Sequence, residues 1–185
     1  NPLNFFNKIS IQLRKSLDAK YIAITGSAGK TSVKELTGFC LNKLAKTYYS
    51  KKSFNNKYGV PLSIFNTPQS KKFVVLEVGM DKKGEIDYLS KLIRPNIALI
   101  TNISYAHIEN FENLGQIAKA KSEIIDNIIP GGTMIINKDD KYYNYFFKKS
   151  LKKKLKIVSF SKKDRKANVV FLNQKKNKNK YLLKF

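Results

Sequence analysis

The chain alternates between short apolar runs and longer segments in which apolar residues recur every three or four positions. Short continuous apolar runs are typical of strands that are covered on both faces of a sheet. The three-to-four-residue recurrence indicates helices with one buried face. The predicted strands are residues 21–25, 73–78, 97–101, 133–137 and 156–160, and the predicted helices are residues 3–17, 30–46, 85–92, 114–129 and 140–151.

Strands that alternate with helices predict an α/β domain, with a mostly parallel sheet flanked by helices. Toward the end of the chain, apolar runs at 169–172 and 181–185 surround a polar stretch at 173–180, which predicts a small C-terminal β-hairpin. The length of 185 residues is typical of one domain. The apolar runs are much shorter than the ~18 residues of a membrane-spanning helix, so we expect no membrane span.

The most informative segment joins the first predicted strand to the next predicted helix. Glycine lets backbone N–H groups approach phosphate oxygens closely, and the first turn of a helix supplies further unpaired N–H groups. A lysine that ends such a loop reaches the terminal phosphates of ATP, and the hydroxyl that follows binds Mg²⁺. We therefore predict an ATP-binding phosphate loop, formed by Thr25, Gly26, Ser27, Ala28, Gly29, Lys30, Thr31 and Ser32.

The predicted loop departs from the general phosphate-loop pattern at one position. Ile24 stands where that pattern has its first glycine, and the spacing here is G-x-x-G-K-T. An ordinary glycine-containing turn between a strand and a helix is the alternative. The string GKTS directly after an apolar strand favours phosphate binding.

The shortened loop resembles that of the Mur ligase family, which reads T-G-[ST]-x-G-K-[TS]. The family consists of cytoplasmic, ATP-dependent ligases that form amide bonds in peptidoglycan precursors. The resemblance covers about residues 20–160 and rests on several strings that occur together in the family's order. These are SFNN-x-x-GVP-L at residues 53–62, E-x-G with GEI at 77–86, AHIE-x-F at 106–111, AKAKSEI at 118–124 and N-x-D-D at 137–140.

Glu77 lies near the carboxyl end of a predicted buried strand, where open α/β sheets place their ligands. A carboxylate there can hold Mg²⁺ beside the phosphate loop, because Mg²⁺ prefers oxygen ligands. An acid that ends a strand and pairs with a lysine is the alternative. The phosphate loop upstream favours the metal, so Thr31 and Glu77 are the predicted ligands of a first Mg²⁺.

His107 and Lys121 also have ordinary explanations, as a structural histidine and as a solvated lysine on a lysine-rich helix. The resemblance implies more. In the family, the position of His107 serves a second Mg²⁺, and in some members the lysine that matches Lys121 is carbamylated by CO₂ into a metal ligand. Such a lysine needs a lowered pKa, which leaves some neutral amine. The resemblance therefore implies catalytic roles for Lys30, Glu77, His107 and Lys121.

Three asparagines are further candidates. Asn137 follows a predicted strand and can cap the next helix, whereas the resemblance places it in the region of the nucleotide base. Asn55 and Asn56 are implied to face the muramyl peptide. The resemblance is strongest to the branch of the family that adds D-alanyl-D-alanine to UDP-N-acetylmuramoyl-tripeptide through an acyl-phosphate intermediate.

Members of the family have an N-terminal UDP-binding domain, a central ATP-binding domain and a C-terminal domain. The resemblance implies that residues 1–19 form an interdomain linker or helix and that residues 20–185 form the central domain, incomplete at its C-terminal end. We expect the two outer domains to be absent from this chain, so the chain alone should not turn over substrate. The whole enzyme is expected to be monomeric.

The chain carries 36 basic and 13 acidic residues, a formal net charge of +23. A nucleic-acid-binding P-loop ATPase is therefore an alternative from a different class. Most of the excess, +14, lies in residues 148–185, beyond most of the matched strings, and we expect no nucleic-acid partner. A ligase similar to folylpolyglutamate or cyanophycin synthetases is the nearer alternative. Cys40 is the sole cysteine, which excludes an intrachain disulfide.

Overall fold

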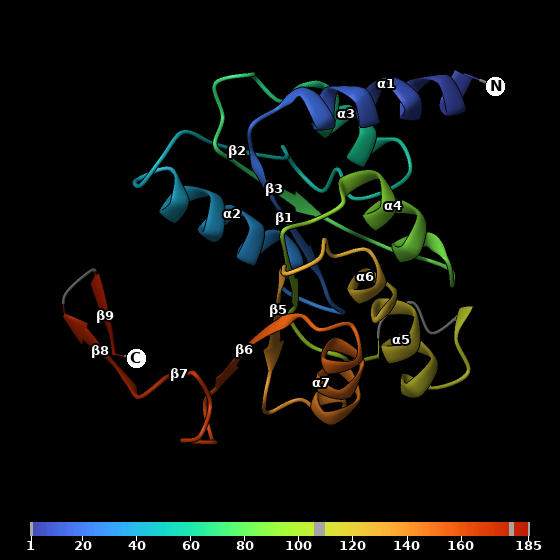
Figure 1. Ribbon diagram of the computed structural model, residues 1–185. Coiled ribbons are helices and arrows are strands. Elements are labelled where there is room, and N and C mark those ends of the chain that lie inside the picture. Colours follow the sequence, from blue (N-terminus) through green and yellow to red (C-terminus); the bar gives the residue numbers. More distant parts are fainter. Residues whose placement is uncertain (1, 106–109, 178–179, 185) are drawn as a thin grey trace.

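A computed structural model describes residues 2–105, 110–177 and 180–184. Figure 1 shows a central sheet, the helices around it, and a hairpin that stands away from both. The helices are α1 (Pro2–Ser16), α2 (Lys30–Leu41), α3 (Gly59–Phe65), α4 (Glu85–Ile93), α5 (Leu114–Lys121), α6 (Glu123–Asp126) and α7 (Tyr143–Lys152). The strands are β1 (Lys20–Thr25), β2 (Thr47–Tyr49), β3 (Phe73–Glu77), β4 (Ile97–Ile100), β5 (Thr133–Asn137), β6 (Lys156–Ser161), β7 (Val169–Val170), β8 (Asn173–Asn177) and β9 (Lys180–Lys184).

The main sheet has seven strands in the order β2-β3-β1-β4-β5-β6-β7, and its neighbouring strands are parallel. This confirms the predicted α/β class. β1 lies between β3 and β4, so the strand order reverses there. Ile24 of β1 is in register with Glu77 of β3 and Leu99 of β4. At such a reversal the carboxyl ends of the strands form a crevice that suits a ligand.

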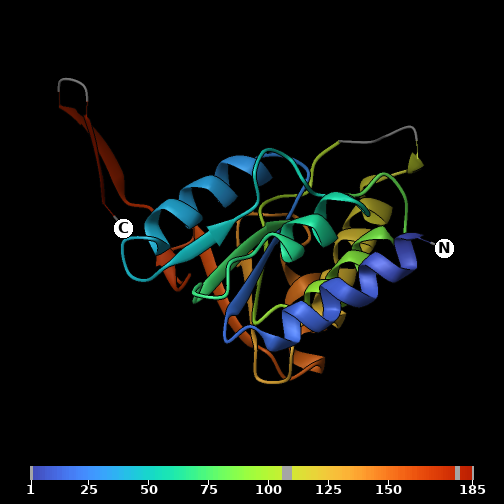
Figure 2. The ribbon, with the colours of Figure 1, turned by 90° about the horizontal axis from the view of Figure 1, so that it is seen from above.

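The two faces of the sheet are covered to different extents. One face holds the larger core, in which Ala23, Leu76 and Met134 are fully buried and α3, α4 and α7 contact the strands. On the other face α2 contacts β1, β2 and β3 and helps to bury Ile24 and Val75. Figure 2 shows α2 on one side of the sheet and α1 and α4 on the other.

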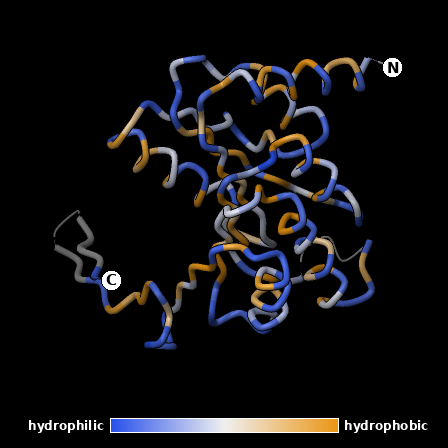
Figure 3. The backbone as a smooth tube through the Cα atoms, in the orientation of Figure 1, coloured by the Kyte–Doolittle hydropathy of each residue, from blue (hydrophilic) through white to orange (hydrophobic). Residues whose placement is uncertain are grey.

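The face that α2 covers is more open over β4 to β6. The apolar side chains of Leu99, Ile135 and Val158 share one register on this face and are half-buried. Farther along, the connection between β6 and β7 is hydrophilic and contributes to the basic C-terminal region (Figure 3). Because β4 and β5 lie between β1 and β6, much of that charge lies at the opposite edge of the sheet from β2.

Two predicted helices have different ends in the structure. The helix predicted over residues 30–46 ends at Leu41, because the Asn42 side chain accepts a hydrogen bond from the N–H of Thr47 and turns the chain into β2. The helix predicted over residues 114–129 divides at Ser122, whose hydroxyl donates to a backbone carbonyl of its own preceding turn. Such back-bonding competes with the regular helical pattern.

The C-terminal strands also differ from the prediction. Val169–Val170 does not belong to the hairpin but forms β7, which pairs in parallel with β6. The hairpin consists of β8 and β9, so the polar stretch predicted as its turn forms most of its first strand. The sequence pattern does not predict β2 and α3, since three and seven residues are too few to show a period. Within the described residues, no helix is long and apolar enough to cross a membrane.

Candidate active site

The turn between β1 and α2 needs glycine at two positions. Gly26 has a φ of 149°, and a Cβ there would lie 1.8 Å from the hydroxyl oxygen of Thr101. Gly29, with a φ of 77°, lies in the left-handed region directly before α2, which residues with a side chain rarely adopt. Thr25 ends β1 fully buried, and its hydroxyl has no hydrogen-bond partner among the described residues.

The segment that follows β4 braces this turn. The N–H of Ser27 donates to the Asn102 carbonyl (2.9 Å), and the N–H of Ala28 donates to the Asn102 side-chain oxygen (3.1 Å). The carbonyl of Ala28 accepts from the hydroxyl of Thr101 (2.7 Å), and the hydroxyl of Ser27 donates to the carbonyl of Ser104 (2.9 Å). These bonds preorganise the turn, which lowers the entropic cost of binding a ligand there.

The first turn of α2 leaves donors for an anion. No side chain caps this helix end, so the N–H groups of its first turn are not bonded to a capping side chain. The positive end of the helix dipole lies at the same place. The ammonium of Lys30 donates to the carbonyls of Gly26 (3.0 Å) and Ser27 (3.4 Å) and therefore lies against the loop. Ser32 is exposed on the same turn. A loop of this form can bind phosphate.

Glu77 ends β3 beside this loop and is 1% exposed. One of its carboxylate oxygens accepts from the hydroxyl of Thr31 (2.8 Å), and the other accepts from the side-chain amide of Asn55 (2.8 Å). The hydroxyl of Ser53 lies 3.4 Å from that of Thr31. The structure thus brings the predicted residues Thr31, Glu77 and Asn55 together from three separate segments.

This cluster has the chemistry of a divalent cation site. Buried carboxylates are normally paired with a cation, but in the described part of the chain no lysine or arginine forms an ion pair with Glu77. Mg²⁺ prefers hydroxyl and carboxylate oxygens and retains several waters, so a few protein ligands suffice. The described ranges hold no group of three His, Cys, Asp or Glu side chains that could bind a metal ion, and the oxygens that lie together here are those of Thr31 and Glu77.

Lys121, the last residue of α5, is 1% exposed. Burial, and to a smaller extent the charge of Lys30, lowers the pKa of Lys121 from 10.5 to about 7. Within residues 2–105, 110–177 and 180–184, its ammonium has no hydrogen-bond or ion-pair partner. The structure thus places Lys121 within electrostatic reach of the loop lysine, and its amine is partly neutral near pH 7.

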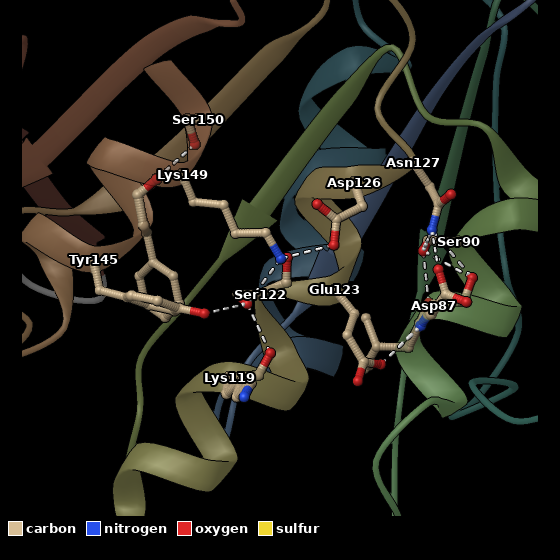
Figure 4. Close-up of polar contacts among 12 residues, drawn as sticks. Asp87, Ser90, Lys119, Ser122, Glu123, Asp126, Asn127, Tyr145, Lys149 and Ser150 are labelled. Atoms are coloured by element: carbon tan, nitrogen blue, oxygen red, sulfur yellow. Dashed lines mark hydrogen bonds and ion pairs between the residues drawn. The ribbon is translucent and has the colours of Figure 1, made fainter. Parts of the chain in front are cut away.

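Polar contacts hold the two short helices around Lys121 in place (Figure 4). Lys149 of α7 donates to the carbonyl of Ser122 (2.9 Å) and to the carboxylate of Asp126 (2.7 Å). On the other side, Glu123 accepts from backbone N–H groups at the start of α4. α5 and α6 are therefore tied to α7 and to α4, which fixes the backbone that carries the buried lysine.

The remaining predicted residues have other surroundings. The side-chain oxygen of Asn137 accepts from the N–H of Asp139 (3.0 Å) in the turn directly after β5. Asn137 does not cap the next helix, because α7 begins at Tyr143 and its N-terminal residue Tyr142 makes no side-chain cap. The side-chain oxygen of Asn56 accepts from the N–H of Gly59 (2.9 Å) and forms the turn that begins α3. His107 lies outside the described residues.

Sequence reasoning did not single out Ser53 or Lys34. Lys34 is fully buried and donates to the carbonyls of Ser50 and Lys52. Lys34 and the buried Gly38 are four residues apart and so face the same side of α2, but the burial of that side is known only from the structure. Lysines on helices are usually exposed to solvent, whereas Lys34 is buried.

The fold and the site define a doubly wound α/β domain with a braced, glycine-containing loop at the end of its central strand. In comparisons with known families, the Mur ligase middle domain model matches residues 24–185. The chain belongs to this family, as its sequence strings indicate.

Relatives and solved structures agree with this assignment. The UDP-N-acetylmuramoyl-tripeptide–D-alanyl-D-alanine ligase of Buchnera aphidicola subsp. Acyrthosiphon pisum is 42% identical over 159 residues, which are 86% of this chain and 34% of that protein. A structure of MurF from Acinetobacter baumannii has a TM-score of 0.86 at 32% identity and covers 95% of this chain and 37% of that one.

MurF from Thermotoga maritima in complex with ADP shares the fold, with a TM-score of 0.86 at 22% identity over 99% of this chain and 42% of that one. The chain spans about a third of the length of the curated relatives it matches.

Proposed function

We propose that this chain is the ATP-binding part of a ligase that adds D-alanyl-D-alanine to UDP-N-acetylmuramoyl-tripeptide in peptidoglycan precursor synthesis. The observation that carries the proposal is the contact of Thr31 and Asn55 with the buried carboxylate of Glu77 beside the loop of Lys30. The names of the curated relatives support the choice of substrates. The ADP complex of a structural neighbour supports ATP as the nucleotide.

In this proposal the braced loop holds the phosphates of ATP. Backbone N–H groups at the start of α2 bind phosphate oxygens, and the ammonium of Lys30 neutralises the β- and γ-phosphates. Asn137 lies near the base of the nucleotide. The proposed nucleotide contacts are Thr25, Gly26, Ser27, Ala28, Gly29, Lys30, Thr31, Ser32 and Asn137.

Thr31 and Glu77 would hold a first Mg²⁺, which when bound offsets charge on the phosphates. A neutral Lys121 amine can add to CO₂: a C–N bond forms, one proton leaves the nitrogen, and a carbamate anion results. This change would turn an ammonium that repels cations into an anionic oxygen ligand. Together with His107, the carbamate would hold a second Mg²⁺.

The proposed reaction has two steps. The terminal carboxylate of the tripeptide attacks the γ-phosphate of ATP, which forms an acyl phosphate and releases ADP. The amine of D-alanyl-D-alanine then displaces phosphate and forms the amide. Two anions meet in the first step, so the main tasks of the chain are positioning and charge neutralisation. Asn55 and Asn56 are proposed to lie toward the peptide.

We propose that residues 1–19 connect this domain to a UDP-binding domain and that residues 20–185 form most of the central domain. A third domain would close over the site. The complete enzyme would be a cytoplasmic monomer, since ATP and the UDP-linked precursor meet in that compartment.

Equilibrium binding of ATP to this chain tests the nucleotide site. Titration calorimetry with ATP and Mg²⁺ should show binding that Lys30→Met weakens by about 100-fold, or about 3 kcal/mol, because charge-assisted phosphate contacts are lost. Lys43→Met is the matched control, since Lys43 is an exposed lysine just after α2. Binding of DNA or RNA with no binding of ATP would favour the nucleic-acid alternative.

Phosphate release tests the substrates. A polypeptide that includes the two outer domains should release phosphate when both UDP-N-acetylmuramoyl-tripeptide and D-alanyl-D-alanine are present, and this chain alone should not. Robust ligation by the chain alone would contradict the proposed domain arrangement. A complete protein that responds to a folate or to other amino acids would contradict the proposed substrates.

A further inference from the structure

Lys34, in the second turn of α2, is a buried cation that the proposed reaction does not use. It is 0% exposed. An ammonium has three N–H donors, and this one has three partners: the carbonyl of Ser50 (2.5 Å), the carbonyl of Lys52 (2.6 Å) and the carboxylate of Glu35 (2.9 Å). Two hydrogen bonds and one ion pair thus surround the ammonium, which offsets the cost of burying the charge.

Both carbonyls belong to the loop that follows β2. Lys52 has a φ of 48°, in the left-handed region that residues with a Cβ seldom adopt. The bond from Lys34 to its carbonyl helps to hold this backbone turn. Directly after the turn, the loop delivers Ser53 and Asn55 to the cluster around Glu77.

Asn55 occupies a tight position at the end of β3. Its carbonyl accepts from the N–H of Gly79 (2.8 Å), while its side chain donates to Glu77 (2.8 Å). A Cβ at Gly79 would lie 2.8 Å from the side-chain carbon of Asn55. The loop is thus held at two places, by β3 near Asn55 and by α2 through Lys34.

We infer that Lys34 is a positioning residue, which ties the helix that carries Thr31 to the loop that carries Asn55 and so sets the geometry around Glu77. The role of the Glu77 cluster in this inference rests on the proposed function. The tie is strong because the loop cannot move away without leaving a buried ammonium and two carbonyls unpaired.

Amide hydrogen exchange tests the geometry in the absence of nucleotide. In Lys34→Met, the amide of Gly79, which donates to Asn55, should exchange about tenfold faster relative to that of Ile135 in β5. Glu35→Gln is the matched control, because it removes the ion pair and keeps both carbonyl bonds, so its exchange ratio should equal that of the wild type. If Lys34→Met does not fold, the same exchange ratio is measured in Lys34→Gln, because the glutamine amide retains part of the donor set.

Nucleotide binding supplies a readout that a purely structural lysine would not change. In Lys34→Met, the gain in ADP affinity on adding Mg²⁺ should fall about tenfold, while the affinity without Mg²⁺ should stay within about twofold of the wild type. Exchange that rises equally at Gly79 and Ile135, together with an unchanged Mg²⁺ effect, would overturn the inference. A wild-type chain that binds no nucleotide would refute the proposed function, while the exchange ratio would still decide the positioning role.

Discussion

Lys34 and Lys121 are both buried near the predicted phosphate loop, and the regions around them differ in polar partners. Lys34 donates to two carbonyls and forms an ion pair with a carboxylate, whereas Lys121 has no such partner among the described residues. Burial disfavours a cation unless polar groups compensate. The first lysine joins two segments. Burial, and to a smaller extent the charge of Lys30, lowers the pKa of the second to about 7.

The comparison shows that two buried lysines of one domain can differ in their surroundings and so in what they can do. A lysine with every donor satisfied is suited to fixing a backbone. A lysine without partners has a partly neutral amine, which is the form that can react with an electrophile such as CO₂. Four predictions test this distinction.

The largest expected effect is on the paired lysine. Lys34→Met should lower the free energy of unfolding by about 3 kcal/mol, because the buried carbonyls of Ser50 and Lys52 lose their donor. Urea unfolding of the variant and the wild type measures the difference. Lys43→Met, at an exposed position, should change the same quantity by less than about 0.5 kcal/mol. Equal effects in the two variants would refute the structural role of the pairing.

Lys121 should make stability depend on pH. Since the pKa of Lys121 is about 7 in the folded chain and 10.5 in the reference state, the unfolded chain binds more protons between these values, and stability rises with pH there. From pH 7 to 9, the wild type should gain about 2 kcal/mol relative to Lys121→Met. Below pH 7 both states are protonated, and the variant should be the more stable protein. Lys119→Met, at an exposed neighbouring position, should show no such trend.

A smaller effect should follow from loosening the backbone around Lys121. Ser122→Ala removes a hydroxyl that donates to the carbonyl of Lys119 and lies 3.1 Å from that of Tyr145. The expected loss is about 1 kcal/mol in the free energy of unfolding, typical of one net hydrogen bond. Chemical denaturation measures it, and a neutral result would show that the network of Figure 4 does not hold α5 and α6.

The smallest effect concerns the ion pair of Lys34. Glu35 is 49% exposed, so Glu35→Gln should reduce stability by less than about 1 kcal/mol, and the loss should shrink as salt is added. Thermal unfolding at two ionic strengths checks this. A loss as large as that of Lys34→Met would mean that the carboxylate, and not the carbonyls, compensates the buried charge.

The architecture was largely predictable from the apolar pattern, and the elements that resisted prediction have physical reasons. β1 and β3 to β5 are mainly apolar runs, as is typical of strands whose two faces are covered or partly covered. The break at Ser122 depends on a side-chain hydrogen bond that periodicity does not report. β8 comes from a polar stretch and owes its form to pairing with β9.

The candidate site was predictable in part. The strand-loop-helix string pointed to Lys30 and Thr31, and the end of an apolar strand pointed to Glu77; the structure joins Thr31 to Glu77 directly. Lys34 was not predictable as a buried group, because its partners are backbone carbonyls of a loop that only the folded chain brings near. The environment of Lys121 likewise depends on packing, although the family resemblance pointed to that residue.

The most direct test of the central claim is the Mg²⁺ dependence of ATP binding to the wild type and to Glu77→Gln. The buried carboxylate accepts from a hydroxyl and an amide of the described residues, and we expect Mg²⁺ to tighten ATP binding by about tenfold or more in the wild type. In Glu77→Gln this gain should vanish, while binding without Mg²⁺ should stay within about twofold of the wild-type value. A variant that keeps the full Mg²⁺ effect would contradict the assignment of Thr31 and Glu77 as the metal site.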